Sequence, residues 1–341
     1  MRAKTKEKTS TTRQEGQSCS TTGAARRHMK RIATVLRTRI RTHYSGDNNV
    51  FQNLGDAINP YILNGLGFEC VSYRIGDDQV LNPGRCLLGI GSLLSSDMLR
   101  NLSLPLDVWG TGWRGKDSAF FDRSDIRFHA VRGPLTAEGF DLPPKQPMGD
   151  PALLMPLLFS RRVEPHKQSI LIPHIYRVSS LLAMQRASAA GCSKIVFPLV
   201  YARLSLATLK SIDLKGTLTD AWNWRGYNQA GIHSVWQLID IISGASFVLT
   251  GALHGAILAQ AYGVPWAAYN DGYLDVPPKW ADWGAYLGIK LSFVKTLKQG
   301  HEWWNDTGRH GQTQSVRPLL NAFPYINASP KAQVIASRIR D

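Results

Sequence analysis

The chain has 341 residues, of which 43% are hydrophobic and 19% are charged. With 30 Gly and 18 Pro that follow no fixed period, this composition excludes collagen-like, coiled-coil and wholly disordered proteins. No apolar run approaches the roughly 18 residues that a membrane-spanning helix needs, and the polar N-terminus lacks the apolar stretch of a secretory signal. The sequence therefore predicts a globular protein of two domains that remains in the cytoplasm.

The formal net charge of +15 is concentrated near the N-terminus. Residues 1–45 contain twelve Lys or Arg against Glu7 and Glu15, which gives +10 and leaves +5 for the remaining chain. Residues 1–28 are rich in Ser, Thr, Gln and Gly, so we expect a disordered basic tail. Such a tail can bind anionic lipid headgroups at about 1 kcal/mol per Lys or Arg. An incidental extension, with Met29 as the true start, is the alternative.

From Ile32 onward the sequence predicts strands that alternate with helices. In the first half the expected elements are a strand at 32–42, a helix at 57–65, strands at 80–89, 104–109 and 125–131, and a helix at 134–139. After a linker at 156–165, the expected elements are a strand at 169–172, a helix at 178–190, a strand at 193–199, a helix at 234–243, a strand at 246–249, a helix at 256–262 and a strand at 265–268. Ser329-Pro330 is typical of the N-cap and first residue of a last helix, which would end at Arg340.

Short strands that alternate with helices predict parallel sheets with helices on their faces. We therefore predict an α/β protein with two Rossmann-like parallel-sheet domains that face a cleft. The first domain is expected over 29–160 and the second over 161–295, followed by a C-terminal helical extension over 296–341. In such sheets, ligands bind at the carboxyl ends of the strands, beside helix N-termini. Functional residues are thus expected in a few loops.

His254 belongs to one of these loops, between the strand at 246–249 and the helix at 256–262. This order predicts that His254 lies at a helix N-terminus and faces the cleft. The helix dipole disfavours a charged imidazole there unless an anion is close, so the position suits a general acid that acts on a phosphorylated ligand. A structural histidine that bonds to the backbone is the alternative.

Two further loops carry polar side chains between a strand and a helix. Arg132 could present its planar fork of donors to a carboxylate or phosphate, and Thr136 could add a hydroxyl. A surface arginine is the alternative. In the earlier loop, which begins at Asn53, Gly55 permits close approach of the backbone. Asp56 follows it and could cap the helix or accept a hydrogen bond from a sugar hydroxyl.

The segment from Gly110 to Gly115 formally fits the dinucleotide fingerprint G-x-G-x-x-G. It lies in the middle of a domain and is followed by Lys116 and Asp117 rather than by an apolar helix, so we expect no dinucleotide cofactor. The nine His are not spaced as metal ligands, and H-E-x-x-H and G-x-S-x-G do not occur, so we expect no metal site. Basic and aromatic residues are not interleaved as in a nucleic-acid-binding module, so no nucleic-acid partner is expected.

Taken together, seven short motifs resemble those of the polysaccharide pyruvyl transferase family. In chain order they are Asn53-Leu54-Gly55-Asp56, Gly110-Thr111-Gly112, Val131-Arg132-Gly133-Pro134-Leu135-Thr136, Gly149-Asp150-Pro151, Ile172-Pro173-His174, Leu253-His254-Gly255-Ala256 and Gly263-Val264-Pro265. The resemblance is strongest to members that decorate bacterial exopolysaccharide repeat units. It implies a glycosyltransferase-B-like pair of Rossmann-type domains. It also implies transfer of a pyruvyl group from phosphoenolpyruvate to a sugar, which forms a ketal.

The resemblance further implies roles for single residues. Phosphoenolpyruvate carries a carboxylate and a phosphate, which Arg132, Lys279 and the loop of His254 would bind. His254 would protonate the enol methylene, after which two hydroxyls of one sugar add and phosphate leaves, with no metal or other cofactor. Many members have Arg where this chain has Ala252, so that anion contact is absent or supplied by another cation such as Lys279. Asp150 is a candidate for acceptor contacts or loop ordering. The other expected substrate-binding residues are Asn53, Asp56, Gly110, Gly112, Thr136, His174 and Leu253.

The expected acceptor is a sugar of a lipid-linked oligosaccharide, and the basic tail leaves open a peripheral contact with the inner face of the cytoplasmic membrane. Trp280 and Trp283 could stack on sugar rings, although large aromatic side chains usually belong to the core. A nucleotide-sugar-dependent glycosyltransferase with the same architecture is the alternative function. A basic adaptor for nucleic acid or membrane, and a family member that has lost its activity, also remain open.

Overall fold

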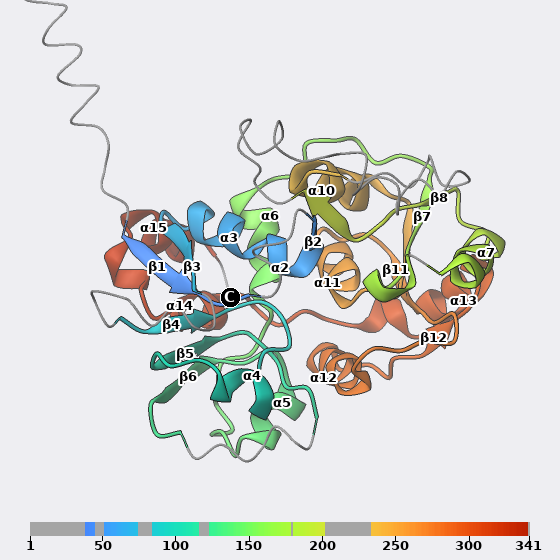
Figure 1. Ribbon diagram of the computed structural model, residues 1–341. Coiled ribbons are helices and arrows are strands. Elements are labelled where there is room, and N and C mark those ends of the chain that lie inside the picture. Colours follow the sequence, from blue (N-terminus) through green and yellow to red (C-terminus); the bar gives the residue numbers. More distant parts are fainter. Residues whose placement is uncertain are drawn as a thin grey trace, which may run out of the picture. The chain divides into compact units, whose positions relative to one another are not determined.

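The computed structural model describes residues 38–44, 51–73, 84–115, 123–178, 180–201 and 233–339 (Figure 1). The chain consists of a unit of residues 1–37 and a unit of residues 38–341, and every described residue belongs to the second unit. The tail expected over 1–28, and the start of the strand expected from Ile32, lie outside the described residues. None of the described helices is both long and apolar enough to cross a membrane.

Five parallel strands form the sheet of the first half, in the order β3-β1-β4-β5-β6. They are β1 (Arg39–Thr42), β3 (Glu69–Ser72), β4 (Cys86–Leu88), β5 (Leu106–Trp109) and β6 (Ile126–Ala130). The central strands β4 and β5 are buried along their whole length, as expected of a parallel sheet covered on both faces.

Five parallel strands also form the sheet of the second half, in the order β12-β11-β10-β7-β8. They are β7 (Ser169–Ile172), β8 (Lys194–Ile195), β10 (Phe247–Thr250), β11 (Trp266–Tyr269) and β12 (Phe293–Val294). The three strands in the middle are buried at every position. Most of their residues are apolar, so burying these strands leaves few polar side chains that need a hydrogen-bond partner.

The strands of the two halves follow the same order. Numbered within its own half, each sheet reads 2-1-3-4-5, which is the order of doubly wound, flavodoxin-like sheets. The winding reverses between β1 and β4 in the first sheet and between β7 and β10 in the second. Ligands bind outside the carboxyl ends of strands at such a reversal. The prediction of an α/β protein with two parallel sheets is confirmed.

Helices follow most of the strands. They are α2 (Leu54–Ala57), α3 (Asn59–Gly65), α4 (Ser96–Arg100), α5 (Pro134–Gly139), α6 (Met155–Leu158), α7 (Leu181–Ala189), α10 (Val235–Gly244), α11 (Leu253–Ala261), α12 (Pro277–Leu287), α13 (Leu297–Asp306), α14 (Arg317–Asn321) and α15 (Pro330–Arg338). Short 3-10 helices are η2 (Pro151–Leu154), η3 (Ile175–Arg177), η4 (Gly308–His310) and η5 (Ile326–Ala328). Some helices differ from the prediction. The single helix expected at 57–65 is divided into α2 and α3. In the second half, α7 begins after its cap at Ser180 rather than at 178, and α11 begins at Leu253 rather than at 256.

One pair of strands joins the two halves and was not predicted. β2 (Phe51–Asn53) pairs antiparallel with β9 (Leu199–Tyr201). The single strand expected at 193–199 was therefore wrong, because the chain forms β8 first and β9 after a break. Just beyond the pair, the N–H of Leu54 donates to the carbonyl oxygen of Pro198 at 2.8 Å. This pairing fixes the start of α2 against the second half.

The end of the chain returns to the first sheet (Figure 1). The indole Nε1–H of Trp109, at the end of β5, donates to the carbonyl oxygen of Leu319 in α14 at 2.8 Å. Ser329, the N-cap of α15, donates to the carbonyl oxygen of Leu66 at 2.6 Å. Helices from opposite ends of the sequence thus pack together beside β1 and β3.

Candidate functional site

A pocket of about 290 Å³ lies at the carboxyl ends of strands from both sheets. Its wall combines the end of β2 and the start of α2, the loop after β4, the loops after β7 and β10, and the start of α12. β7 and β10 flank the reversal of winding in the second sheet, and β4 flanks it in the first. The pocket therefore occupies the place where doubly wound sheets bind ligands.

The structure gathers six of the ten expected site residues at this pocket. They are Asn53, Asp56, His174, Leu253, His254 and Lys279. The other four do not line it. They are Gly110, Gly112, Arg132 and Thr136. These four belong to the loops after β5 and β6 and to α5.

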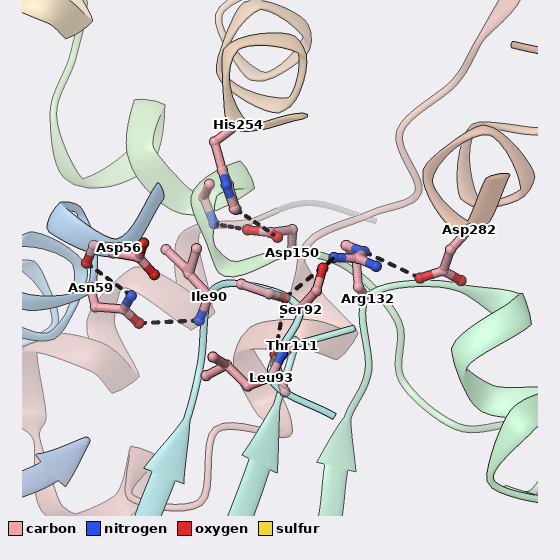
Figure 2. A network of polar contacts seen from close by, with 12 residues as sticks. Asp56, Asn59, Ile90, Ser92, Leu93, Thr111, Arg132, Asp150, His254 and Asp282 are labelled. Carbon is pink, nitrogen blue, oxygen red and sulfur yellow. Dashed lines mark hydrogen bonds and ion pairs between the residues drawn. The ribbon is translucent and has the colours of Figure 1, made fainter. Parts of the chain in front are cut away.

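His254 lies in the first turn of α11, and its side chain is 12% exposed. Its Nε2 atom is 3.3 Å from Oδ2 of Asp150, a carboxylate from the other half of the chain (Figure 2). Another edge of the ring lies against Gly55 in α2, where a Cβ atom would be only 2.1 Å from Nδ1. Glycine at position 55 therefore leaves the space that the imidazole occupies.

Asp150 is placed by the loop between α5 and η2. The N–H of Gly149 donates to the carbonyl oxygen of Val131 at 2.9 Å. Gly149 has a φ of +139°, which residues with a side chain rarely adopt. Asp150 Oδ1 accepts a hydrogen bond from the N–H of Ala152 at 2.9 Å and caps η2. This arrangement leaves Oδ2 to face His254 (Figure 2).

Arg132 is fully buried, and its guanidinium lies behind residues that line the pocket. Nε donates to Oδ2 of Asp282 in α12 at 3.2 Å, and Nη1 donates to Oγ of Ser92 at 2.9 Å (Figure 2). Asp282 also accepts from the N–H and the hydroxyl of Thr136, at 3.0 and 2.7 Å. Ser92 lines the pocket. Arg132 thus supports the wall from behind, and neither Arg132 nor Thr136 lines the pocket.

Gly110 and Gly112 give room to the neighbouring loops. A Cβ atom at Gly112 would lie 2.1 Å from Cζ of Arg132, so glycine lets the guanidinium pack against the backbone. Gly110 has a φ of +90°, and its Cβ would be 2.4 Å from Cδ of Pro151. Both glycines shape the support of the site, and neither contacts the pocket.

A charged cluster forms the side of the pocket nearest α12. Nζ of Lys279 is 2.6 Å from Oδ2 of Asp275, and Nε2 of His174 is 3.4 Å from the same oxygen. These contacts with His174 and Lys279 lower the pKa of the Asp275 carboxyl, against the effect of burial. Burial lowers the pKa of Lys279, and the ion pair with Asp275 opposes this fall. Nδ1 of His174 accepts from the N–H of Tyr176 at 3.3 Å, which leaves Nε2 to carry the proton.

Two charged pocket residues were not predicted. Arg114 lies in the glycine-rich segment after β5, and Asp275 precedes Lys279 by four residues. Asp275 lies just before the N-cap of α12 and Lys279 in its first turn, so an acidic residue four positions before a lysine at a helix start is the signal that could have found the pair. Trp280 and Trp283 are buried, at 1% and 0% exposed, so they pack in the core and do not stack on a ligand. Nowhere in the described part of the chain do three or more His, Cys, Asp or Glu side chains gather as metal ligands.

Comparison with known proteins adds the decisive observation. The family model for polysaccharide pyruvyl transferases matches residues 41–272. The chain belongs to this family. It is also 27% identical over 242 residues to the succinoglycan biosynthesis protein ExoV of Rhizobium meliloti (strain 1021). That match covers 70% of this chain and 62% of the relative, so the chain spans less than two thirds of the length of ExoV.

Two solved structures resemble this pyruvyl transferase family member more remotely. An uncharacterised protein of Klebsiella pneumoniae subsp. pneumoniae NTUH-K2044 has a TM-score of 0.41 and 14% identity, over 81% of this chain and 99% of that chain. The heptosyltransferase WaaC of E. coli has a TM-score of 0.30 and 11% identity, over 70% and 91%. Both scores are low, and the fold assignment depends on the two parallel sheets themselves.

Proposed function

We propose that the protein transfers a pyruvyl group from phosphoenolpyruvate to two hydroxyls of one sugar during exopolysaccharide synthesis. The observation that carries this proposal is the composition of the pocket. Its wall holds cations and histidines that suit an anion, together with an amide and a carboxylate that suit sugar hydroxyls. Family membership supports the reaction type, and the relationship to ExoV supports a polysaccharide acceptor.

The donor would bind at the start of α11 and α12. Phosphoenolpyruvate carries a carboxylate and a phosphate, and the pocket offers Lys279, Arg114 and the N-terminal turn of α11. Lys279 lines the same pocket as Ala252, the position where many members of the family carry arginine. We assign to Lys279 the anion contact that this arginine would make. Arg132 would act indirectly, because it holds Ser92 in the wall.

The chemical step needs one proton donor. His254 would transfer a proton to the methylene carbon of phosphoenolpyruvate, which becomes a methyl group and leaves the central carbon electrophilic. One sugar hydroxyl then adds to this carbon and a second displaces phosphate, so two C–O bonds form and one C–O bond to phosphate breaks. Of the two protons that the hydroxyls release, one returns to His254 and the other leaves with phosphate.

The acceptor would bind beside α2. Asn53 and Asp56 line the pocket here, and Nδ2 of Asn53 is 3.5 Å from Oδ2 of Asp56. An amide and a carboxylate can exchange hydrogen bonds with neighbouring hydroxyls of a sugar ring. We propose a lipid-linked oligosaccharide as the acceptor and a cytoplasmic enzyme, with the basic tail over 1–28 in contact with anionic lipid at the membrane surface.

The test is a thermal-shift titration with phosphoenolpyruvate, UDP and GDP in parallel. Phosphoenolpyruvate should raise the melting temperature of the wild-type protein, because a ligand that binds the native state stabilises it. Lys279→Ala should remove this response, whereas Lys331→Ala, an exposed lysine of α15, should keep it. A response to a nucleotide without one to phosphoenolpyruvate would overturn the proposal in favour of a nucleotide-sugar-dependent glycosyltransferase.

A further inference from the structure

A buried carboxylate from the first half of the chain faces the pocket histidine of the second half. The side chain of Asp150 is fully buried, and its Oδ2 atom is 3.3 Å from Nε2 of His254. A buried carboxylate is costly unless a cation or hydrogen-bond donors compensate its charge. Oδ1 has the N–H of Ala152 as a donor, and Oδ2 has the imidazole. The buried Arg132 does not fill this role, because its contacts go to Asp282 and the loop after β4.

The geometry distinguishes the two nitrogens of the His254 ring. Nε2 faces Asp150, whereas Nδ1 lies at the edge that meets Gly55. A Cβ atom at position 55 would be 2.1 Å from Nδ1, so this edge of the ring packs against the backbone of α2, beside the pocket residues Leu54 and Asp56. The ring is therefore held by Asp150 on one side and by α2 on another.

The charged form of His254 needs support in this position. The positive end of the α11 dipole disfavours an imidazolium in the first turn of the helix. A carboxylate at Nε2 offsets this effect and holds the ring in one orientation, as carboxylates do for catalytic histidines in general. Other charged or titratable side chains also face the pocket. They are Asp56, Arg114, His174, Tyr176, Asp275 and Lys279. Asp150 is the carboxylate in direct contact with the ring.

We propose that Asp150 is a positioning residue that orients His254 and supports its charged form. This inference rests on the proposed function, in which His254 is the general acid. In that reaction an N–H bond of the imidazolium breaks as a C–H bond forms at the methylene carbon of phosphoenolpyruvate, and the ring regains a proton from an attacking sugar hydroxyl.

Two substitutions separate this role from the capping of η2. Asp150→Asn keeps an oxygen for the N–H of Ala152 and removes the negative charge beside the ring. Asp150→Ser keeps a good N-cap residue but is too short to reach His254. Ser329→Ala is the matched control, because it removes a buried cap of α15 on an element that does not line the pocket.

The first measurement is steady-state phosphate release from phosphoenolpyruvate, with methyl glycosides of common hexoses as acceptors. Both Asp150 variants should lower kcat by about 10² or more, the usual size of a general-acid contribution, with little change in KM for phosphoenolpyruvate. Ser329→Ala should lower the melting temperature and leave kcat unchanged. If Asp150→Asn lowers only the melting temperature, Asp150 is a structural cap and the proposal is wrong.

The second measurement needs no turnover, so it separates this proposal from the proposed function. Imidazole ¹⁵N NMR at neutral pH, with the signals of His254 assigned from His254→Gln, reports which ring nitrogens carry protons. The wild-type ring should show Nε2 hydrogen-bonded to Asp150, and Asp150→Asn should shift the Nε2 signal. Unchanged nitrogen signals in Asp150→Asn would overturn the proposal. The expected change in a protein without pyruvyl transfer would uphold the pairing and reject the proposed function alone.

Discussion

Lys279 is held in the pocket wall as a cation whose charge depends on pH. Its ammonium lies 2.6 Å from Asp275, and burial lowers its pKa while the ion pair opposes this fall. A lysine with a lowered pKa carries its positive charge below that pKa and loses it as the pH rises through it. An exposed lysine keeps its charge to a higher pH. An anionic ligand at Lys279 should therefore dissociate earlier on the alkaline side than it would from an ordinary lysine.

The first prediction follows from the lowered pKa of Lys279. Affinity for phosphoenolpyruvate should decrease as the pH rises above neutral, a range in which the phosphate is already fully ionised because its second pKa is about 6. Lys279→Arg should move the loss to higher pH, because arginine stays protonated. Lys279→Met should bind weakly at every pH. Calorimetric titrations between about pH 7 and 10 check this; an unchanged alkaline loss in Lys279→Met would assign it to another group.

For single residues, the sequence predicts which positions lie at the site better than it predicts which groups their side chains contact. The ends of predicted strands and the starts of predicted helices led to His254 and Asn53, and the family resemblance led to His174; all three line the pocket. The same reasoning led to Arg132, whose guanidinium is buried against Asp282. The partner is 150 residues away along the chain, so no local pattern reveals that the charge is already neutralised.

The carboxylate of Asp282 links helix α12 to helix α5 by hydrogen bonds. Asp282 of α12 accepts from the N–H and hydroxyl of Thr136 in the first turn of α5, and from Nε of Arg132 just before it. Asp282 therefore supplies an acceptor for an N–H in the first turn of α5, which has no partner within its own helix. Lys279 precedes Asp282 by three residues on α12, so the two side chains lie on neighbouring parts of one face. The contact with α5 should thus determine how far Lys279 reaches into the pocket.

The second prediction concerns this contact. Asp282→Ala should lower the free energy of unfolding by about 3–5 kcal/mol, because it leaves the buried Arg132 without a counter-charge. It should also weaken the binding of phosphoenolpyruvate, since α12 is no longer tied to α5. Urea denaturation of both single variants and of Arg132→Met with Asp282→Ala measures the coupling. The double variant should lose less stability than the sum of the single variants; additive losses would mean that the two side chains do not interact.

Elements with a local signature were predictable, and those without one were not. Ser329-Pro330 marks the start of α15 by its cap, and Pro134 to Gly139 gives the bounds of α5. α11 begins three residues before the expected helix, because Gly255 gives no local sign that the helix has already started. The pairing of β2 with β9 depends on segments from opposite halves and has no local signature.

The chain completes the strands of the first sheet before those of the second, and its C-terminal helices then return to the first sheet. All strands of the first sheet precede α6, and those of the second lie between β7 and β12. α14 and α15 then pack against the first sheet. Alternating strands and helices in the sequence predict two parallel sheets, and the structure has them. The strand order 2-1-3-4-5 and the return of the C-terminus were beyond prediction, because both are decided by packing between segments distant in sequence.

The returning segment attaches to the first sheet through an aromatic cluster. The ring of Phe323 lies 4.5 Å from that of Trp109 in β5 and 5.4 Å from that of Phe68, measured between ring centroids. All three side chains are almost fully buried. The indole of Trp109 also donates to the backbone of α14. The first sheet therefore depends on residues that follow the second sheet in the sequence.

The third prediction tests this dependence. Phe323→Ala should lower the free energy of unfolding by about 3–5 kcal/mol, as expected for a buried phenylalanine whose cavity cannot collapse. Val334→Ala, in the same C-terminal segment but 46% exposed, is the control and should change stability by less than about 0.5 kcal/mol. Because the cluster covers β5, amide hydrogen exchange in Phe323→Ala should increase in the first sheet more than in β7, β10 and β11. Equal losses in the two variants, or exchange that increases uniformly over both sheets, would show that the C-terminal helices cover the first sheet without stabilising it.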